Sequence, residues 1–103
     1  MKILNYLSVL LLIFSPLSWG KPKITVTFDK LATGFTQVKI RNDTFESLAC
    51  YVAIDGFKEK FQLRAKSSSP WITATDKRYN YQNFSTWCDY LETHPSYRNY
   101  RAY

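Results

Sequence analysis

The sequence predicts a small all-β protein, an antiparallel immunoglobulin-like β-sandwich of about six or seven short strands that carries one disulfide. Three observations lead to this prediction. Apolar and polar residues alternate along several short segments, turn-forming residues separate those segments at intervals of about 8 to 12 positions, and the chain contains two cysteines. The length of 103 residues also limits the choice, because a TIM barrel or a two-domain enzyme needs a longer chain.

Residues 1–20 have the organisation of a cleaved secretory signal peptide. Lys2 is followed by an almost wholly apolar run over residues 3–14, and the segment ends with small residues that suit cleavage after Gly20. The run is shorter than the roughly 20 residues of a membrane-spanning helix, and no second apolar stretch follows it. We therefore expect a single domain over residues 21–103, secreted or periplasmic, with no transmembrane span after cleavage. An uncleaved N-terminal anchor is the alternative.

The two cysteines, Cys50 and Cys88, are expected to form a structural disulfide across the core. Small exported domains use disulfides to supplement a small core, whereas a reactive pair more typically occurs as Cys-x-x-Cys or beside a histidine. Closing a loop of about 38 residues stabilises the folded state by roughly 4 kcal/mol in the loop-entropy description. This is a large share of the net stability of a small domain.

Two alternating segments open the predicted domain. Residues 23–29 alternate strictly, and residues 35–41 resume the alternation after a turn that contains a glycine. The cluster Asn42-Asp43-Thr44 then predicts another turn. The side chains expected to face the core are Ile24, Val26 and Phe28 in the first strand and Val38 and Ile40 in the second.

The next two strands are predicted to form a hairpin. Residues 48–54 alternate, Asp55-Gly56 follows directly, and the returning strand covers residues 57–64. A two-residue Asp-Gly between alternating segments is a strong hairpin signal, because both central positions require positive φ. The side chains expected on the core side are Leu48, Cys50, Val52, Ile54, Phe57, Phe61 and Leu63.

The last third of the chain is less regular. Residues 71–75 predict a short strand, and residues 76–83, which are polar and rich in tyrosine, predict a loop. The segment between Ser85 and Leu91 fits both a helical and a strand periodicity. We favour a strand because it places the second cysteine opposite the first. A short helix from Ser85 to Leu91, which makes the protein α+β, is the alternative.

The aromatic residues near the C-terminus divide into two expected groups. Trp87 and Tyr90 are expected in the core beside the disulfide. Tyr97 is expected to pack against the sandwich, while residues 99–103 are expected to contribute little to stability. The side chains expected to be exposed or available to a partner are Tyr79, Tyr81, Tyr100, Arg101 and Tyr103.

The residue types that most enzymes need are scarce. The chain has one histidine and three glycines. These numbers argue against a Ser-His-Asp triad, a Gly-x-Ser-x-Gly turn and a histidine-based metal site, because each of them needs histidine or glycine at defined positions. His94 stands directly before Pro95, where a surface turn is the ordinary interpretation. Pairs of carboxylates could serve glycosidic acid/base chemistry, but any domain of this size offers such pairs. We expect no enzymatic activity, no cofactor and no metal.

The net charge of +6 is spread along the chain, with acidic residues between the basic ones. This distribution lacks the concentrated basic patch of a nucleic-acid-binding protein, and export also argues against nucleic acid as a partner. Aromatic and arginine side chains are instead interleaved in the last third of the chain. Such side chains dominate the binding energy of protein interfaces, and aromatic rings also stack on sugars. The candidate binding residues are Trp71, Arg78, Tyr79, Tyr81, Tyr100 and Arg101.

From these features we expect a non-enzymatic binding module whose partner is another protein of the cell envelope or the extracellular space. Two alternatives stay open. One is a small inhibitor or immunity-type protein that blocks an enzyme of the same compartment with residues 76–83. The other is a module that binds a glycan or an anionic cell-wall polymer. The sequence indicates no particular oligomeric state.

Overall fold

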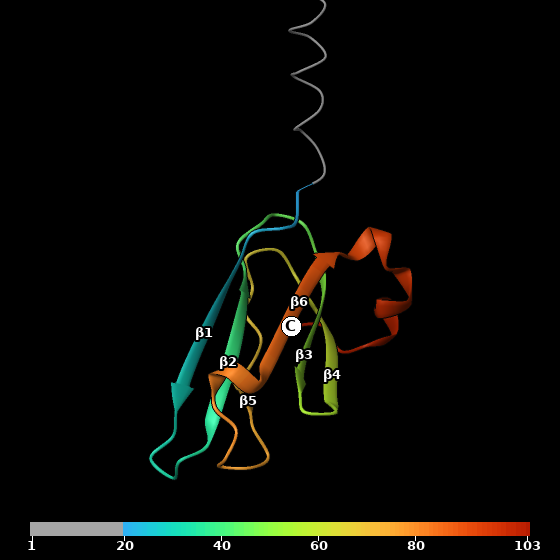
Figure 1. The fold of residues 1–103 in the computed structure, drawn as a ribbon. Coiled ribbons are helices and arrows are strands. Elements are labelled where there is room, and N and C mark those ends of the chain that lie inside the picture. The colour runs from blue at the N-terminus through green and yellow to red at the C-terminus, as the bar shows by residue number, and fades with distance from the viewer. Residues whose placement is uncertain (1–19) are drawn as a thin grey trace, which may run out of the picture.

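A computed structural model of the chain describes residues 20–103, and its strands form two small antiparallel sheets (Figure 1). The signal-peptide prediction for residues 1–20 lies, apart from Gly20, outside the described residues. The two sheets confirm the predicted all-β sandwich, with six strands. The strands are β1 (Ile24–Lys30), β2 (Thr36–Asn42), β3 (Leu48–Ile54), β4 (Phe57–Leu63), β5 (Ile72–Thr73) and β6 (Phe84–Tyr90).

The two sheets contain three strands each. Sheet A has the order β1-β2-β5, and sheet B has the order β4-β3-β6. β1 pairs with β2 over its whole length, whereas β5 contributes only two residues, so the predicted strand over residues 71–75 is shorter than expected. β3 is the centre of sheet B and pairs along its whole length with β4 on one side and β6 on the other.

The β3–β4 hairpin confirms the prediction made from Asp55-Gly56. Both residues have positive φ, 39° at Asp55 and 88° at Gly56, as a two-residue hairpin turn requires. Glycine adopts this conformation without strain, and aspartate adopts it more readily than most other residues. The turn sets the register in which Ile54 pairs with Phe57 and Leu48 pairs with Leu63.

The core lies between the inner faces of the two sheets. Because successive residues of a strand point to opposite faces, the alternation in the sequence decides which side chains enter it. Most of the residues predicted to face the core are buried, but Phe28 and Phe57, near strand ends, remain 39% and 48% exposed. The buried residues of the core cluster are Val38, Ile40, Leu48, Cys50, Val52, Ile54, Phe61, Leu63, Ile72, Ala74, Phe84 and Cys88.

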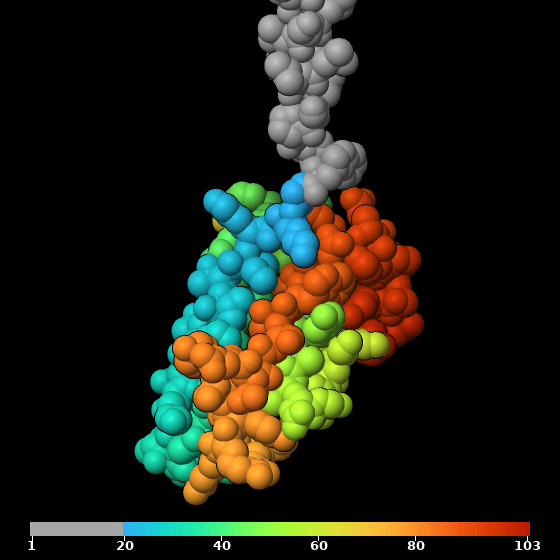
Figure 2. All heavy atoms as spheres, viewed as in Figure 1, coloured from blue at the N-terminus to red at the C-terminus, as the bar shows by residue number. Residues whose placement is uncertain are grey.

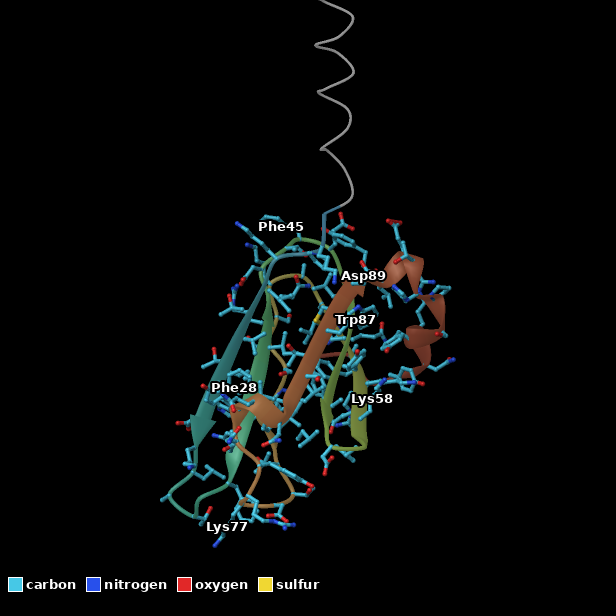
Figure 3. All side chains as sticks on the ribbon, in the orientation of Figure 1. Phe28, Phe45, Lys58, Lys77, Trp87 and Asp89 are labelled. Carbon is cyan, nitrogen blue, oxygen red and sulfur yellow. A yellow bond between two sulfur atoms is a disulfide. The ribbon has the colours of Figure 1, made fainter. Side chains whose placement is uncertain are left out.

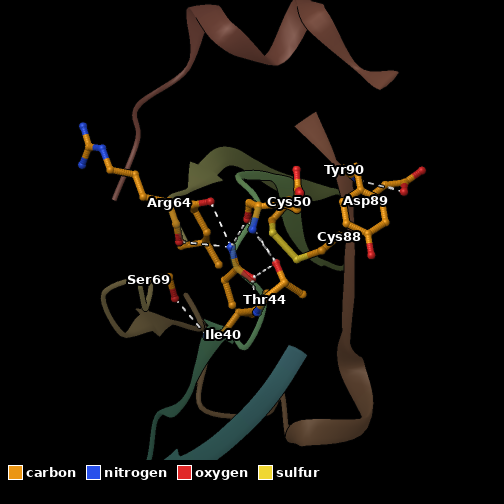
Figure 4. Close-up of a disulfide and its surroundings, with 11 residues drawn as sticks. Ile40, Thr44, Cys50, Arg64, Ser69, Cys88, Asp89 and Tyr90 are labelled. Carbon is orange, nitrogen blue, oxygen red and sulfur yellow. Dashed lines mark hydrogen bonds between the residues drawn. A yellow bond between two sulfur atoms is a disulfide. The ribbon is translucent and has the colours of Figure 1, made fainter. Parts of the chain in front are cut away.

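The segment from Ser85 to Leu91 is a strand as far as Tyr90, so the helical alternative is wrong. β6 pairs with β3 so that Cys88 lies directly opposite Cys50, and the two sulfurs are bonded (Figure 4). Both cysteines are buried on the core side, as predicted. The disulfide does not cross the core, however. It joins neighbouring strands of sheet B, whereas the disulfide of immunoglobulin domains links the two sheets.

Asn42 is a buried anchor rather than a turn residue at the surface. Its side-chain Nδ2 donates to the carbonyl oxygens of Glu46, Leu63 and Arg64 at 2.7, 3.3 and 3.0 Å. Its Oδ1 accepts from the backbone N–H and the hydroxyl of Thr44. Figure 4 draws these hydrogen bonds as dashed lines and labels Thr44 and Arg64. A fully buried amide needs partners for all its polar atoms. These bonds therefore tie the end of β2 in sheet A to the end of β4 in sheet B.

The C-terminal segment folds over sheet B. It contains two short 3-10 helices, η3 (Leu91–Thr93) and η4 (Pro95–Asn99). The last residues run beside β4, where Gln62 donates to the backbone oxygen of Arg101 and accepts from the N–H of Tyr103. The ring of Tyr103 packs edge-on against Phe61, with 5.8 Å between the ring centres. The prediction that Tyr103 is available to a partner is therefore wrong, because this residue belongs to the edge of sheet B.

Candidate functional site

The residues predicted to bind a partner lie in three separate places. Trp71 precedes β5, and Lys39 Nζ lies 4.8 Å from the centre of its indole ring. Tyr100 and Arg101 are exposed, as predicted, and lie in the tail beside β4. The loop between β5 and β6 carries the remaining residues, Arg78, Tyr79 and Tyr81. Figures 1 and 2 show this loop at the end of the sandwich where β1 ends and β2 begins, which we call the loop end.

The loop of residues 76–83 is held in shape by its own side chains. Near its start, Arg78 donates to Asp76 Oδ1 from its backbone N–H at 2.9 Å and from Nε at 3.1 Å, and it donates to Oδ2 from Nη2 at 2.7 Å. The side-chain hydrogen bonds, followed by the backbone bond, lower the pKa of Asp76 to about 2. The carboxylate is therefore ionised, and able to hold the loop, at neutral pH.

Tyr79 ties the loop to the turn between β3 and β4. Its hydroxyl donates to Asp55 Oδ2 at 2.7 Å, and its ring packs against the core. The hydrogen bond to Asp55 raises the pKa of Tyr79, because ionisation would remove the donated proton and place two negative charges together. The prediction that Tyr79 is exposed is therefore wrong. This residue anchors the loop to the β3–β4 turn and the core.

The far end of the loop closes in a capping box. Asn80 Oδ1 accepts from the N–H of Gln82 at 2.8 Å, and Asn83 Oδ1 accepts from the N–H of Asn80 at 2.9 Å. These bonds satisfy N–H groups at the start of η2 (Tyr81–Asn83). They also fix the backbone of Tyr81, whose side chain is exposed, as predicted.

A groove runs between Tyr81 and the end of β1. The ring centres of Phe28 and Tyr81 are 5.9 Å apart, and Phe28 in turn meets the buried ring of Phe84 at 5.7 Å. The groove has a volume of about 360 Å³ and is lined by Phe28, Asp29, Lys30, Thr36, Asn80 and Tyr81. Apolar ring faces beside a few polar groups are the usual composition of a recognition site. Sequence reasoning missed Phe28, because the alternation of β1 assigns it to the core; its place near a strand end was the available signal.

Three loops meet at the loop end. Leu31 is exposed in the β1–β2 turn, and Phe57 is exposed directly after the β3–β4 turn. Figure 3 shows Phe28, Lys58 and Lys77 in this part of the molecule. We call the exposed apolar and arginine side chains here the loop-end surface, which consists of Phe28, Leu31, Phe57, Arg78 and Tyr81.

A second group of aromatic rings covers the outer face of sheet B. Trp87 stacks on Tyr51 with 5.3 Å between the ring centres, and it meets His94 and Tyr97 at 5.0 and 6.0 Å. Tyr97 is half-buried, as predicted. The prediction that Trp87 lies in the core is wrong, because Trp87 is on the face of β6 opposite to Cys88, whereas Tyr90 packs against the core, as predicted. Because these rings pack against one another, they hold the C-terminal segment on sheet B.

A second concavity, of about 580 Å³, lies at the opposite end of the sandwich. Asp89 Oδ2 is 3.0 Å from His94 Nε2, and this hydrogen bond, followed by one from the N–H of Tyr90, lowers the pKa of Asp89. The residues that line it are Gly20, Glu46, Asp89, Tyr90, Glu92, Thr93 and His94. This lining is acidic and contains an acid–imidazole pair, and among residues 20–103 it includes neither serine nor cysteine as a nucleophile.

Residues 20–103 contain no group of three or more His, Cys, Asp or Glu side chains that could hold a metal ion. In the same part of the chain, no helix has the length and apolar character that a bilayer crossing needs. Comparisons with protein-family models, with curated proteins and with solved structures found no match to this chain.

Proposed function

We propose that the protein is an exported, non-enzymatic binding module that contacts a protein of the cell envelope or the extracellular space through its loop end. The observation that carries the proposal is the loop of residues 76–83, whose backbone is held by hydrogen bonds while Arg78 and Tyr81 stay exposed. The Cys50–Cys88 disulfide supports export, because such bonds persist in oxidising compartments.

A loop that is already ordered favours binding, because little conformational freedom is lost when the partner arrives. Three contacts provide this order: Arg78 with Asp76, Tyr79 with Asp55, and the pair Asn80 and Asn83. They lie at the start, the middle and the end of the loop. The loop is therefore presented in one shape by the two-sheet scaffold.

The loop-end surface suits a protein partner with an apolar protrusion. Phe28 and Tyr81 offer flat ring faces beside a concave groove. The Arg78 side chain is 83% exposed, although its guanidinium also bonds to Asp76. The groove itself is lined by one residue of each charge, Lys30 and Asp29. Tyrosine and arginine are among the residue types that dominate binding energy at protein interfaces.

Photo-crosslinking from the loop tests this proposal. A photoreactive amino acid in place of Gln82, next to Tyr81, should trap one protein of defined mass in the native compartment. Tyr81→Ala and Arg78→Ala should each reduce the trapped product about tenfold, because each removes an interface anchor. Tyr100→Ala removes an exposed tyrosine far from the loop and is the matched control. If both loop variants trap as much partner as the unmodified protein, the loop end is not the contact surface.

The same ordered loop supports a second candidate function, a small inhibitor that inserts residues 76–83 into the cleft of an enzyme. A rigid loop on a braced scaffold enters a cleft with a low ordering cost. The identity of the crosslinked partner separates the two functions. An enzyme whose activity falls when the purified protein is added supports inhibition, whereas a partner without such a response supports a binding module.

Salt dependence distinguishes a protein partner from an anionic polymer or a glycan. The exposed rings of Trp71 and Tyr100 have lysine ammonium groups beside them, Lys39 at 4.8 Å and Lys60 at 5.7 Å from the ring centres. Binding of an anionic polymer to such groups should weaken steeply with ionic strength. Contact through the loop-end surface, which is largely aromatic, should depend on salt much less.

A further inference from the structure

β1 has an open edge within the described part of the chain. It is the terminal strand of sheet A, with β2 beside it, and Figure 1 shows it at the outer left of the sandwich. The outer edge of β4 in sheet B is different, because the backbone of the C-terminal residues bonds to it. A terminal strand with unpaired N–H and C=O groups is a template for another strand.

The hydrogen bonds of β1 identify the residues that face this edge. The backbone oxygen of Lys23 accepts from the N–H of Asp43. In an antiparallel pair, positions that bond across the ladder alternate with positions that do not. The odd-numbered residues of β1 therefore bond to β2, and the even-numbered residues direct their N–H and C=O groups outward. The open-edge residues of β1 are Ile24, Val26, Phe28 and Lys30.

We propose that β1 pairs in antiparallel orientation with β1 of a second copy of this chain, with Val26 opposite its own counterpart. In this register Lys23 of each copy lies opposite Asp29 of the other, so an opposite-charge pair forms at each end of the seam. Directly opposite charges of unlike sign stabilise a strand pair, and charges of like sign destabilise it. The charge pattern of Lys23 and the strand β1 that follows it is thus complementary to itself.

The remaining pairs of this register also match. On the core side, Ile24 lies opposite Phe28, and the second strand would cover part of the exposed Phe28 ring. On the outer side, Thr25 lies opposite Thr27. Apolar pairs and threonine pairs are both favourable across antiparallel strands.

Neighbouring registers lack this match. Sliding one copy by two residues in one direction places Lys23 opposite Thr27 and brings Pro22, which has no N–H to donate, opposite Phe28. Sliding it in the other direction places Lys23 opposite Leu31. The charges and the proline therefore both favour the register centred on Val26.

Asp29 is available for the proposed charge pair. Its Oδ2 accepts from Gln37 Nε2 at 3.2 Å, and within residues 20–103 its Oδ1 has no hydrogen-bond donor. Both Lys23 and Asp29 are exposed. The seam would contain about six backbone hydrogen bonds and would bury less than the roughly 1,200 Å² of a stable interface. A weak, concentration-dependent dimer is therefore expected.

Charge reversal tests the pairing in solution. Sedimentation velocity of the purified, oxidised protein over about 10 to 500 µM should show the dimer increasing with concentration. Lys23→Asp and Asp29→Lys each place like charges opposite one another, so each should raise the dimer Kd about tenfold. The double variant restores opposite charges and should return the Kd to within about threefold of the original value.

Lys30→Asp is the matched control for Lys23→Asp. It changes the net charge equally, but in the proposed register Lys30 lies opposite Pro22, so its Kd should change much less than that of Lys23→Asp. A double variant as weak as the single variants would overturn the register. Unmodified protein that stays monomeric over the whole concentration range would overturn the pairing itself.

Cysteine crosslinking reads the register directly. Thr25 and Thr27 do not bond across the proposed seam, and such opposite positions bring Cα atoms to about 4.5 Å, within reach of a disulfide. A mixture of Thr25→Cys protein with Thr27→Cys protein should give a mixed crosslinked dimer under mild oxidation. Neither variant alone should crosslink, because each of these positions faces its own counterpart only in a shifted register. Self-crosslinking of either variant, or no product in the mixture, would contradict the proposal.

Discussion

Sheets A and B have the same number of strands, yet they differ in how their strands are secured. In sheet B, β3 pairs along its full length with β4 and β6, the disulfide joins β3 to β6, and the C-terminal residues bond to β4. In sheet A, β5 has two residues, and β1 has an open edge in the described chain. Sheet B thus contains the disulfide and the covered strand edge, while the open edge of β1 belongs to sheet A and the exposed rings of Phe28 and Tyr81 lie at the loop end.

This difference separates the residues that stabilise the fold from the residues of the proposed binding surface. The disulfide and the backbone bonds of the C-terminal residues are in sheet B, where the central strand β3 is paired on both sides. Exposed rings and unpaired backbone groups are concentrated where pairing is incomplete, and such groups gain most from a partner. Variants in sheet B are therefore expected to lower stability, and variants at the loop end are expected to alter local contacts with little effect on the fold.

Removing the disulfide should cause the largest loss of stability. Replacing both Cys50 and Cys88 with alanine removes a link between positions separated by 38 residues, which should lower the free energy of unfolding by about 4 kcal/mol. The thermal midpoint should then fall by about 15 to 30 °C, measured by circular dichroism. Unmodified protein under reducing conditions should melt at a similar temperature. A fall of less than about 5 °C would mean that sheet B does not depend on this bond.

Asn42→Ala should give the next largest effect, because it breaks the link between the two sheets. It removes the side-chain donor to the buried carbonyl oxygen of Leu63 and to the partly buried carbonyl oxygens of Arg64 and Glu46. The expected loss is about 3 kcal/mol in urea unfolding. Asn80→Ala removes a capping side chain at the loop end and serves as the comparison, with an expected loss of about 1 kcal/mol. Equal losses would show that Asn42 is no more than a turn residue.

Deleting residues 101–103 should destabilise the protein moderately and expose the edge of β4. The deletion removes backbone bonds to Gln62 and Arg64 and the packing of Tyr103 on Phe61. We expect a loss of about 2 kcal/mol and a greater tendency to aggregate, because a second edge becomes unpaired. This outcome differs from the expectation from sequence that residues 99–103 contribute little to stability. Arg101→Ala keeps the backbone bonds and should leave the thermal midpoint nearly unchanged.

The smallest effect is expected at the loop end, where Arg78→Gln should raise the pKa of Asp76 from about 2 toward 3.8. The folded-state pKa lies below the ordinary value, so the stabilisation from this pair is present above pH 3.8 and is lost as the pH falls through about 2. Both side chains are near solvent, and the titration of the Asp76 carboxylate by NMR is therefore the measurement. Lys77→Gln alters a neighbouring charge and should leave this pKa in place.

The fold class was predictable because strand alternation and turn chemistry act over a few residues. The alternation around Val38 and Val52 identifies two buried strands, and Asp55-Gly56 identifies the hairpin through its positive φ values. The disulfide was predictable from the number of cysteines and the expected export, although its position within sheet B was not. A pairing between two residues does not say whether the strands that carry them are neighbours in one sheet or lie in opposite sheets.

The candidate site was predictable only in part. Residue type and local polarity correctly indicated that Tyr81 is exposed, and they placed Arg78, which is also exposed, among the candidate binding residues. They did not indicate that Tyr79 is an anchor, because its partner Asp55 lies 24 positions away in the chain. Phe28 shows the opposite case, since its strand pattern predicts burial while its place near the strand end leaves it exposed.

Residue types, periodicity and turn chemistry thus determined by themselves that this chain forms a two-sheet β structure with one disulfide and an exposed aromatic loop. Only the tertiary structure decided which edges are covered, that Asn42 and Tyr103 are structural, and that Phe28 lies beside Tyr81. The physical reason is the separation along the chain between the residues that interact. Alternation and positive φ are properties of adjacent residues, whereas burial and edge pairing depend on segments that are distant in the chain and meet only after folding.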